Sequence, residues 1–231
     1  MNTNESLRNL MSDSHAKGEV YIEQPIVAIV DDDVSIREAL YELILSSGMR
    51  PMVFSSTHEL LNSDILDTPG CLILDVRMPG VNGLELQRQL AQRGNVKPII
   101  FLTGYGDIPM TVEAMKAGAV DFLTKPVREQ TLLDAISEAI KLDEQRRHRE
   151  KIVNHNIECY SALTPRERDV FREVVRGRLN KQIAYDLGIS EVTVKLHRGN
   201  VMRKMEASTI GELIRSWETL RSRLNILKSM D

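Results

Sequence analysis

A short apolar run that ends in a single acid constrains this chain more than any other feature. Residues 71–74 read Cys-Leu-Ile-Leu, Asp75 follows directly, and Pro79, Gly80 and Gly83 come soon after. An apolar run bounded by turn-forming residues predicts a buried strand that delivers Asp75 to a loop. In an open parallel sheet, ligands bind outside the carboxyl ends of the strands, so Asp75 is expected at a functional edge.

Four further apolar runs in the front half alternate with helical patterns. The first, at residues 26–30, ends at Asp31, and Ser35 followed by Glu38 has the spacing of a capping box for the next helix. The other runs lie at 52–54, 99–102 and 120–123, and helices are expected near 36–47, 59–61, 84–92, 109–117 and from 129 onward. Because parallel strands need crossover connections and helices supply them, the sequence predicts an α/β fold with a doubly wound, five-stranded parallel sheet.

The ends of these strands carry residues suited to phosphoryl transfer. Asp31 and Asp32 follow the first strand, Asp75 the third, Thr103 the fourth and Lys125 the fifth. Because these strand ends meet at one edge of the sheet, the three carboxylates are expected within a few Å of each other, and they can all stay ionised only if a cation neutralises them. A small oxygen-lined cluster suits Mg²⁺, for which Mn²⁺ could substitute. The Thr103 hydroxyl and the Lys125 ammonium can each bind a phosphoryl oxygen. The pattern predicts that Asp75 accepts a phosphoryl group and holds it as an acyl phosphate.

Taken one at a time, these residues have simpler interpretations. Asp33 is expected mainly to cap a helix, Thr103 alone would be an ordinary strand-end residue, and Phe122 alone would belong to the core. Their joint placement at four of the five strand ends favours a site.

Charge is divided unevenly along the 231 residues. Residues 1–160 carry 16 Lys and Arg against 24 Asp and Glu, and residues 161–231 carry 14 against 9. A basic tail suggests a nucleic-acid partner, although a solvated surface would also account for this surplus. Cys71 and Cys159 show no metal-binding spacing and no evident pairing, which favours a reducing cytosol. With no recognisable signal peptide or membrane span, a soluble cytoplasmic protein with no membrane partner and a flexible N-terminal arm at residues 1–24 is expected.

The helix that begins near Glu129 is expected to continue as a helical linker, because neither Gly nor Pro occurs between Val127 and Ala162. A solvated, charged helix is favoured over an apolar seam with a second copy through residues 152, 153 and 157. The expected organisation is a first domain at 25–140, a linker at 141–160 and a second domain at 161–231.

The second domain begins with a strong helix start, in which Thr164 caps, Pro165 takes the first position and Glu167 the third. A second helix at about 180–187 ends at Gly188, and a third covers about 191–205. A helix, a glycine-containing turn and a helix are the geometry of helix-turn-helix DNA binding, so a small all-α domain is predicted.

The third helix has an inner and an outer face. Val194, Val201 and Met205 are expected to pack inward, whereas the outer face carries Val192, Lys195, Leu196, Gly199 and Arg203. A glycine in a helix interior costs about 0.5–1 kcal/mol, and close approach to DNA is one thing that it could provide. Leu196 could meet a thymine methyl, Lys195 a guanine edge and Arg203 a phosphate.

The front half resembles the receiver domain of two-component response regulators, and residues 103–110 and 116–126 are similar to the FixJ branch. The resemblance implies a flavodoxin-like sheet of order 2-1-3-4-5 with Asp75 as phosphoacceptor. It implies Mg²⁺ held by Asp31, Asp32, Asp75 and the main-chain carbonyl of Arg77. Thr103 and Phe122 would form a coupled switch pair, Lys125 would pair with phosphate, and Lys125-Pro126 would be a cis peptide.

The tail resembles the LuxR-type helix-turn-helix in the segments 163–167, 180–184 and 189–197. By this resemblance, contacts to the DNA backbone would come from Lys181, Thr193, Arg198 and Arg203. Gly199 departs from members that carry a base-reading lysine there, so the operator cannot be borrowed from them. The closing helix, with an apolar face of Ile210, Leu213, Ile214, Trp217 and Leu220, would serve a dimer unless it packs only on its own domain.

These features predict a transcription factor controlled by phosphorylation. The expected partners are a sensor histidine kinase, promoter DNA, RNA polymerase and, once phosphorylated, a second copy of the chain. One rival is a phosphatase of the haloacid-dehalogenase type with Asp31 as nucleophile. The other is a constitutive DNA-binding protein whose front half only dimerises. An enzymatic role is not expected beyond slow self-phosphorylation from small donors and autodephosphorylation.

Overall fold

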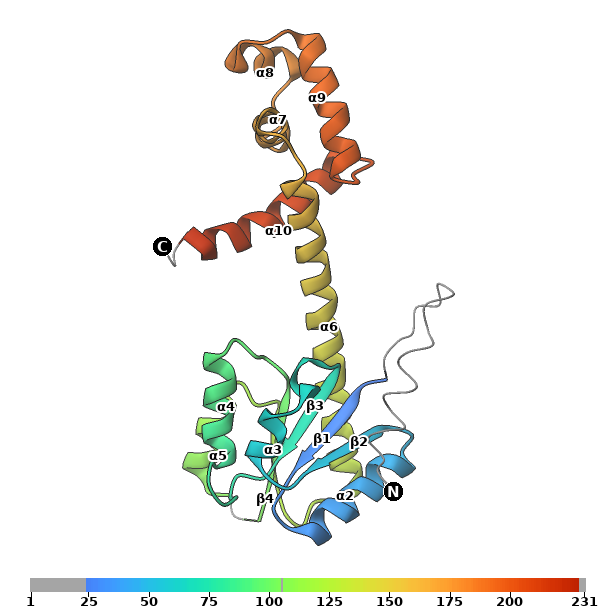
Figure 1. The fold of residues 1–231 in the computed structure, drawn as a ribbon, viewed down its shortest axis with the longest axis vertical. Helices are drawn as coiled ribbons and strands as arrows, with labels where there is room; N and C mark the ends of the chain where they lie inside the picture. Colours follow the sequence, from blue (N-terminus) through green and yellow to red (C-terminus); the bar gives the residue numbers. More distant parts are fainter. Residues whose placement is uncertain (1–23, 105, 229–231) are drawn as a thin grey trace. The chain divides into compact units, whose positions relative to one another are not determined.

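The computed structural model describes residues 24–104 and 106–228, so the N-terminal arm expected at residues 1–24 lies outside the described residues except for its last member (Figure 1). The chain divides into two compact units between Glu144 and Gln145. We refer to them as the N-terminal and the C-terminal unit. No helix in the described part of the chain is both long and apolar enough to span a membrane.

The N-terminal unit is built on five parallel strands in the order β2-β1-β3-β4-β5. The strands are β1 Ile26–Val30, β2 Arg50–Phe54, β3 Gly70–Leu74, β4 Ile99–Thr103 and β5 Asp121–Thr124. Register pairs Val30 of β1 with both Phe54 and Leu74, so the carboxyl ends of β1, β2 and β3 lie level. The predicted doubly wound sheet and its order are confirmed.

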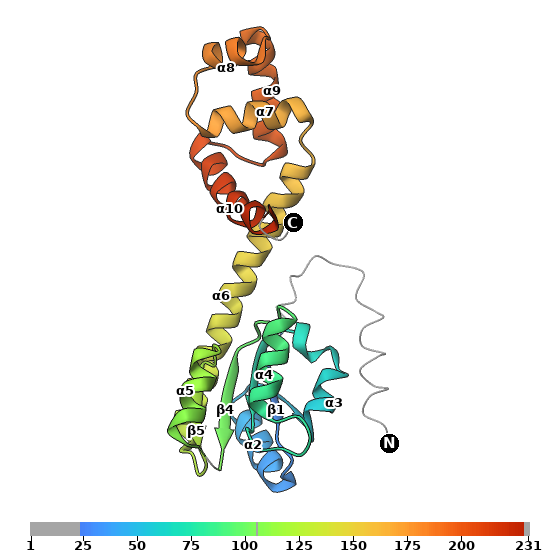
Figure 2. The same cartoon turned by 90° about the vertical axis from the view of Figure 1, so that its left-hand side faces the viewer.

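Helices cover both faces of this sheet (Figures 1 and 2). One face carries α3 Thr57–Leu61, α4 Gly83–Gln92 and α5 Ile108–Lys116, and the short 3-10 helix η1 Asp64–Asp67 follows α3. The other face carries α2 Val34–Ser46 and the first part of α6 Glu129–Ser161. Strands covered on both faces explain the continuous apolar runs in the sequence.

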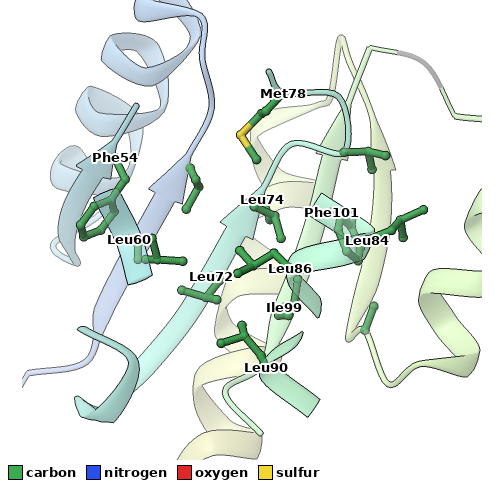
Figure 3. Packing of buried hydrophobic residues seen from close by; sticks show 14 of the residues in the cluster. Phe54, Leu60, Leu72, Leu74, Met78, Leu84, Leu86, Leu90, Ile99 and Phe101 are labelled. Carbon is green, nitrogen blue, oxygen red and sulfur yellow. The ribbon is translucent and has the colours of Figure 1, made fainter. Parts of the chain in front are cut away.

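Alternate strand residues pack into two apolar layers. Figure 3 shows the first layer, in which strand side chains meet α3 and α4 through Leu60, Leu72, Leu74, Leu84, Leu86, Leu90 and Phe101. The second layer joins Ile29, Ile73 and Ile100 to α2 and α6. Because both layers hold the strands, the loops at their carboxyl ends start from fixed positions.

The capping box expected from Ser35 and Glu38 is wrong. Helix α2 begins two residues earlier than expected, at Val34, and its cap is Asp33, whose side chain accepts hydrogen bonds from the backbone N–H groups of Ser35 and Ile36. The expectation that Asp33 is mainly a helix cap is thereby confirmed.

Helix α6 runs for 33 residues without interruption, as the absence of Gly and Pro predicts. Its charged part is not fully solvated, because Asp143 is completely buried and accepts a hydrogen bond from the backbone N–H of Gly70 at 2.9 Å. Near its end, Ile157 packs on the core of the C-terminal unit, so that residue serves its own chain.

The C-terminal unit adds four helices to the end of α6 (Figure 2). They are α7 Pro165–Val175, α8 Asn180–Leu187, α9 Glu191–Lys204 and α10 Ile210–Lys228. Thr164 and Glu167 form the predicted capping box, and Gly188 ends α8 with a left-handed φ of 63°. The predicted helix-turn-helix is confirmed.

The apolar face of α10 is used inside the unit. Leu213 and Leu220 are buried, and the ring of Trp217 meets that of Phe171 edge-on at 5.6 Å. The prediction that this face serves a dimer is therefore wrong for Leu213 and Leu220, because the core of the unit already covers them. Ile210, which is 42% exposed, is the member of the stripe left most open.

Candidate functional site

The carboxyl ends of β1 and β3 bring three acids together. Asp31, Asp32 and Asp75 each offer a carboxylate oxygen, and these oxygens lie within 4.8 Å of one another. Asp31 and Asp75 are buried and Asp32 is exposed, so the cluster has one side open to solvent. Several oxygen ligands in so small a space fit a hard divalent ion such as Mg²⁺.

Lys125 provides a positive charge within this cluster. Its ammonium lies 2.5 Å from Oδ2 of Asp31 and 3.0 Å from Oδ2 of Asp75, and its side chain is 17% exposed. Burial raises the pKa of Asp31, although the hydrogen bond from Lys125 opposes this rise. Burial alone would lower the pKa of Lys125, but its hydrogen bonds to the two carboxylates raise the pKa overall. The lysine is therefore charged and holds both acids in place.

Thr103 and Phe122 lie on the neighbouring strands β4 and β5. Thr103 is 1% exposed at the end of β4, and its carbonyl accepts a hydrogen bond from the backbone N–H of Lys125 at 2.8 Å. Phe122 is half-buried and packs against the ring of Phe101, with centroids 5.8 Å apart. A shift at β5 would thus affect both Phe122 and the backbone that carries Lys125.

Three residues near the site were given no role there from the sequence. A Cβ on Gly83 would come within 2.4 Å of the carbonyl oxygen of Asp75, and one on Gly106 within 2.8 Å of Cε1 of Phe122. Arg37 donates to the carbonyl oxygen of Asp31 at 2.6 Å. Gly83 is the first residue of α4, and Gly106 lies between β4 and α5. A glycine at either place is a weak signal in the sequence, because the contacts that it permits depend on the folded structure.

Arg77 also reaches the site through its main chain. Its backbone N–H donates to Oδ1 of Asp75 at 3.1 Å, which helps to orient that carboxylate. The peptide between Lys125 and Pro126 is cis, as the family resemblance implies. The strand ends thus assemble Asp31, Asp32, Asp75, Arg77 and Lys125 at one edge of the sheet.

Helix α9 presents the outer face that the sequence predicts. Val194, Val201 and Met205 are 0%, 0% and 4% exposed, whereas Val192 and Leu196 are 75% and 64% exposed. Lys181, Lys195, Gly199 and Arg203 are exposed, and Thr193 and Arg198 are half-buried. Open apolar side chains beside cations are the composition of a surface that meets both bases and phosphates.

Two of the half-buried residues have partners within the unit. Arg198 donates to Oδ1 of Asn180 at 2.9 Å and so ties α9 to the start of α8. The hydroxyl of Thr193 lies 2.8 Å from that of Ser190, the cap of α9. These contacts position the two helices relative to each other.

Comparison with known proteins agrees with both units. Residues 27–137 match the response regulator receiver domain, and residues 161–217 match the bacterial regulatory proteins of the luxR family. Nodulation protein W of Bradyrhizobium diazoefficiens is 49% identical over 195 residues, which cover 84% of this chain and 86% of that protein. The chain belongs to the response regulators with a LuxR-type DNA-binding domain. It is a regulator of transcription, as its relatives are.

Other response regulators give the same result. TodT of Pseudomonas putida is 51% identical over 199 residues, covering 86% of this chain and 88% of its own. The solved structure of the response regulator StyR matches with a TM-score of 0.78 at 46% identity, covering 84% of this chain and 98% of that one. Full-length FixJ from B. japonicum matches with a TM-score of 0.52 at 36% identity, covering 86% and 98%. Membership in this family favours a regulator over the rival phosphatase.

Proposed function

We propose that this response regulator accepts a phosphoryl group on Asp75 from a sensor histidine kinase and then binds promoter DNA as a dimer. The observation that carries the proposal is the position of Asp75 at the end of β3, 3.0 Å from the Lys125 ammonium and within 4.8 Å of two further acids. In the transfer, an oxygen of Asp75 forms a bond to phosphorus as the bond between phosphorus and the histidine nitrogen breaks, and the imidazole leaves with the electron pair.

Asp31, Asp32, Asp75 and the main-chain carbonyl of Arg77 would hold Mg²⁺, for which Mn²⁺ could substitute. The fit rests on the oxygen-only donor set and its open side. When bound, the ion offsets the negative charge of the incoming phosphate. Lys125 pairs with one phosphoryl oxygen, and the Thr103 hydroxyl donates to another. The hydrogen bond from Arg77 keeps Asp75 oriented toward the donor.

Thr103 and Phe122 would pass the change to the surface. Once the Thr103 hydroxyl turns toward the phosphoryl group, the space beside β5 changes, and the half-buried Phe122 ring can move inward. The surface of α5 and β5 would then favour a second copy, so that phosphorylation shifts an existing equilibrium. Exposed apolar side chains on α5 support this, since Ile108 is 81% exposed and Val112 44%.

The DNA contacts would come from α8 and α9. Lys195, Leu196 and Gly199 would face base edges, and Lys181, Thr193, Arg198 and Arg203 would meet the DNA backbone. Two copies would engage two half-sites, and RNA polymerase would be the further partner at the promoter. Contact with a kinase and with promoter DNA would place the protein in the cytoplasm, as the sequence predicts.

Intact mass after incubation with acetyl phosphate and Mg²⁺ tests the phosphoacceptor. The parent protein and the control Asp64→Asn, which changes an exposed acid on η1, should each gain one phosphoryl group. Asp75→Asn should gain none, and chelation of the metal should abolish labelling. Equal labelling of Asp75→Asn would contradict the proposal, and a parent protein that takes no label would favour the constitutive DNA-binding alternative.

Operator selection tests the DNA-binding part of the proposal separately. Phosphorylated protein should enrich a sequence with two half-sites more strongly than unphosphorylated protein does. Equal enrichment by Asp75→Asn and the phosphorylated parent would show that phosphorylation does not control binding.

A further inference from the structure

A second group of metal-ligating side chains lies in the C-terminal unit. His155 and Cys159 lie one turn apart on α6, and Glu206 follows the end of α9. Nε2 of His155 lies 3.6 Å from Sγ of Cys159 and 3.2 Å from Oε2 of Glu206. The three ligand atoms lie within 4.8 Å of one another. Two elements distant in sequence thus bring a nitrogen, a sulfur and an oxygen close together.

The two separations that involve Nε2 of His155 fit edges of a tetrahedral zinc site. Bonds from zinc measure about 2.0–2.1 Å to nitrogen, about 2.3 Å to sulfur and about 2.0–2.2 Å to oxygen. At a tetrahedral angle, these bond lengths separate nitrogen from sulfur by about 3.6 Å and nitrogen from oxygen by about 3.3–3.5 Å. The observed separations of 3.6 and 3.2 Å are close to both values.

We propose that His155, Cys159 and Glu206 bind Zn²⁺ and leave the fourth position to water. The ligand set contains a thiolate and an imidazole, which suit a borderline metal such as zinc far better than Mg²⁺. This separates the site by chemistry from the oxygen-only cluster around Asp75 in the N-terminal unit.

The surroundings provide the open side that a fourth ligand needs. His155 and Glu206 line a groove of about 460 Å³, together with Asn156, Glu212 and Arg215. The side chains of His155 and Glu206 are 53% and 67% exposed, whereas Cys159 is only 8% exposed. The sulfur would therefore be the inner ligand, and water would enter from the groove.

The backbone at Glu206 supports the same assignment. Glu206 has a φ of 51°, a left-handed conformation that no other non-glycine residue adopts among the described residues. Left-handed backbone costs a residue other than glycine about 1–2 kcal/mol, and glycine is the usual choice just after a helix. The carboxylate that takes this position points to His155 of α6.

Two simpler interpretations of this cluster, an ion pair and a reactive thiol, account for fewer of its contacts. An ion pair between His155 and Glu206 would not require the sulfur of Cys159 at 3.6 Å from the same nitrogen. A reactive thiol is disfavoured because burial, with Glu206 and Glu158 nearby, raises the pKa of Cys159 and keeps it protonated. Zinc would displace that proton and join α6 to the end of α9, which carries the proposed DNA surface.

Titration with Co²⁺ as a probe for zinc tests the site in the full-length, reduced protein. Tetrahedral cobalt bound to a thiolate gives a charge-transfer band in the near ultraviolet and strong visible bands, whereas cobalt held by carboxylates and water gives only weak visible bands. We expect the parent protein to develop the charge-transfer band at one equivalent. Addition of Zn²⁺ should then remove the band.

Variants separate this site from every other. Cys159→Ser should lose the charge-transfer band, and His155→Asn and Glu206→Gln, which change exposed side chains, should weaken Co²⁺ binding at least tenfold. Cys71→Ser, which removes the other thiol, and Asp75→Asn should retain the band. A parent protein without the band, or a band that survives Cys159→Ser, would overturn the proposal. Equal affinity of the parent and both exposed variants would overturn it as well.

Discussion

The buried carboxylate of Asp143 accepts a hydrogen bond from the backbone N–H of Gly70, at 2.9 Å. Asp143 lies on α6 and is 0% exposed, and Gly70 begins β3, the strand that ends next to Asp75. A Cβ on Gly70 would come within 2.0 Å of the carbonyl oxygen of Ile26, so β1, β3 and α6 meet here without room for a side chain. This contact fixes α6 to the amino end of β3, whereas the acidic cluster lies at the carboxyl end of the same strand.

Asp143→Ala should destabilise the N-terminal unit by about 1–3 kcal/mol, because a buried N–H loses its acceptor. Asp143→Asn should cost less, since an amide oxygen can still accept. Far-UV circular dichroism during urea unfolding reports on both units, whereas fluorescence of the one tryptophan, Trp217, reports on the C-terminal unit. The part of the dichroism transition that tryptophan fluorescence does not follow should shift to lower urea concentration, while the fluorescence midpoint stays. A shift confined to fluorescence would contradict this assignment.

Local patterns predicted the sheet and the acidic cluster well. The apolar runs at β1 and β3 end where the strands end, and Asp31 and Asp75 follow them at one edge because parallel strands share their direction. The outer face of α9 followed from its helical period in the same way.

Contacts between distant segments could not be predicted from these patterns. Asp143 was expected in a solvated linker because its neighbours are charged, and its partner Gly70 lies 73 residues earlier. Cys159 and His155 lie four residues apart on α6, but Glu206, the third member of the proposed zinc site, comes from the distant end of α9, so spacing along the sequence does not reveal the group. Periodicity shows that a face of α10 is apolar but not whether its own core or a second chain covers it.

The stability of the C-terminal unit should fall as the pH drops below about 4.5. Glu167 is 3% exposed, its carboxylate accepts from Lys204 at 2.7 Å, and the hydrogen bond from Lys204 lowers its pKa from 4.5 to about 2. A depressed pKa contributes stability that is present above 4.5 and lost as the pH falls toward 2, worth up to about 3 kcal/mol. Urea unfolding followed by Trp217 fluorescence at several pH values measures this loss.

The variant Glu167→Gln should be less stable at pH 7 and should flatten this pH dependence. The exposed control Glu191→Gln should follow the parent curve. A parent curve that does not change between pH 5 and pH 3 would show that the ion pair contributes little.

Gly199→Ala should stabilise the free protein and weaken DNA binding. A Cβ at this position meets no described atom within 4 Å, and alanine is favoured over glycine in a helix by about 1 kcal/mol. If DNA approaches Gly199 closely, the added methyl group meets the bases or the sugar. Unfolding by urea and binding to the selected operator measure the two effects on one variant, and unchanged affinity would rule out close approach.

Arg203→Ala, in contrast, should weaken binding to every DNA sequence to a similar degree. Loss of one phosphate contact makes the negative slope of log K, the logarithm of the binding constant, against log salt concentration less steep by about 0.9. Lys195→Ala should instead change which operator sequence is preferred, because a base contact carries sequence information. Binding at several salt concentrations to the selected operator and to a scrambled one distinguishes the two outcomes.

Gly106→Ala should uncouple phosphorylation from DNA binding. The new Cβ would lie 2.8 Å from Cε1 of Phe122 and 3.2 Å from Cγ2 of Thr124, so the ring must leave its present position before any signal arrives. Gly104→Ala is a matched control in the same loop, because its Cβ meets no described atom within 4 Å. Both variants should take up phosphate from acetyl phosphate as the parent does, since neither removes a group that contacts Asp75. Only Gly106→Ala should lose most of the difference in operator affinity between the phosphorylated and unphosphorylated forms, and a full response in this variant would show that Phe122 does not carry the signal.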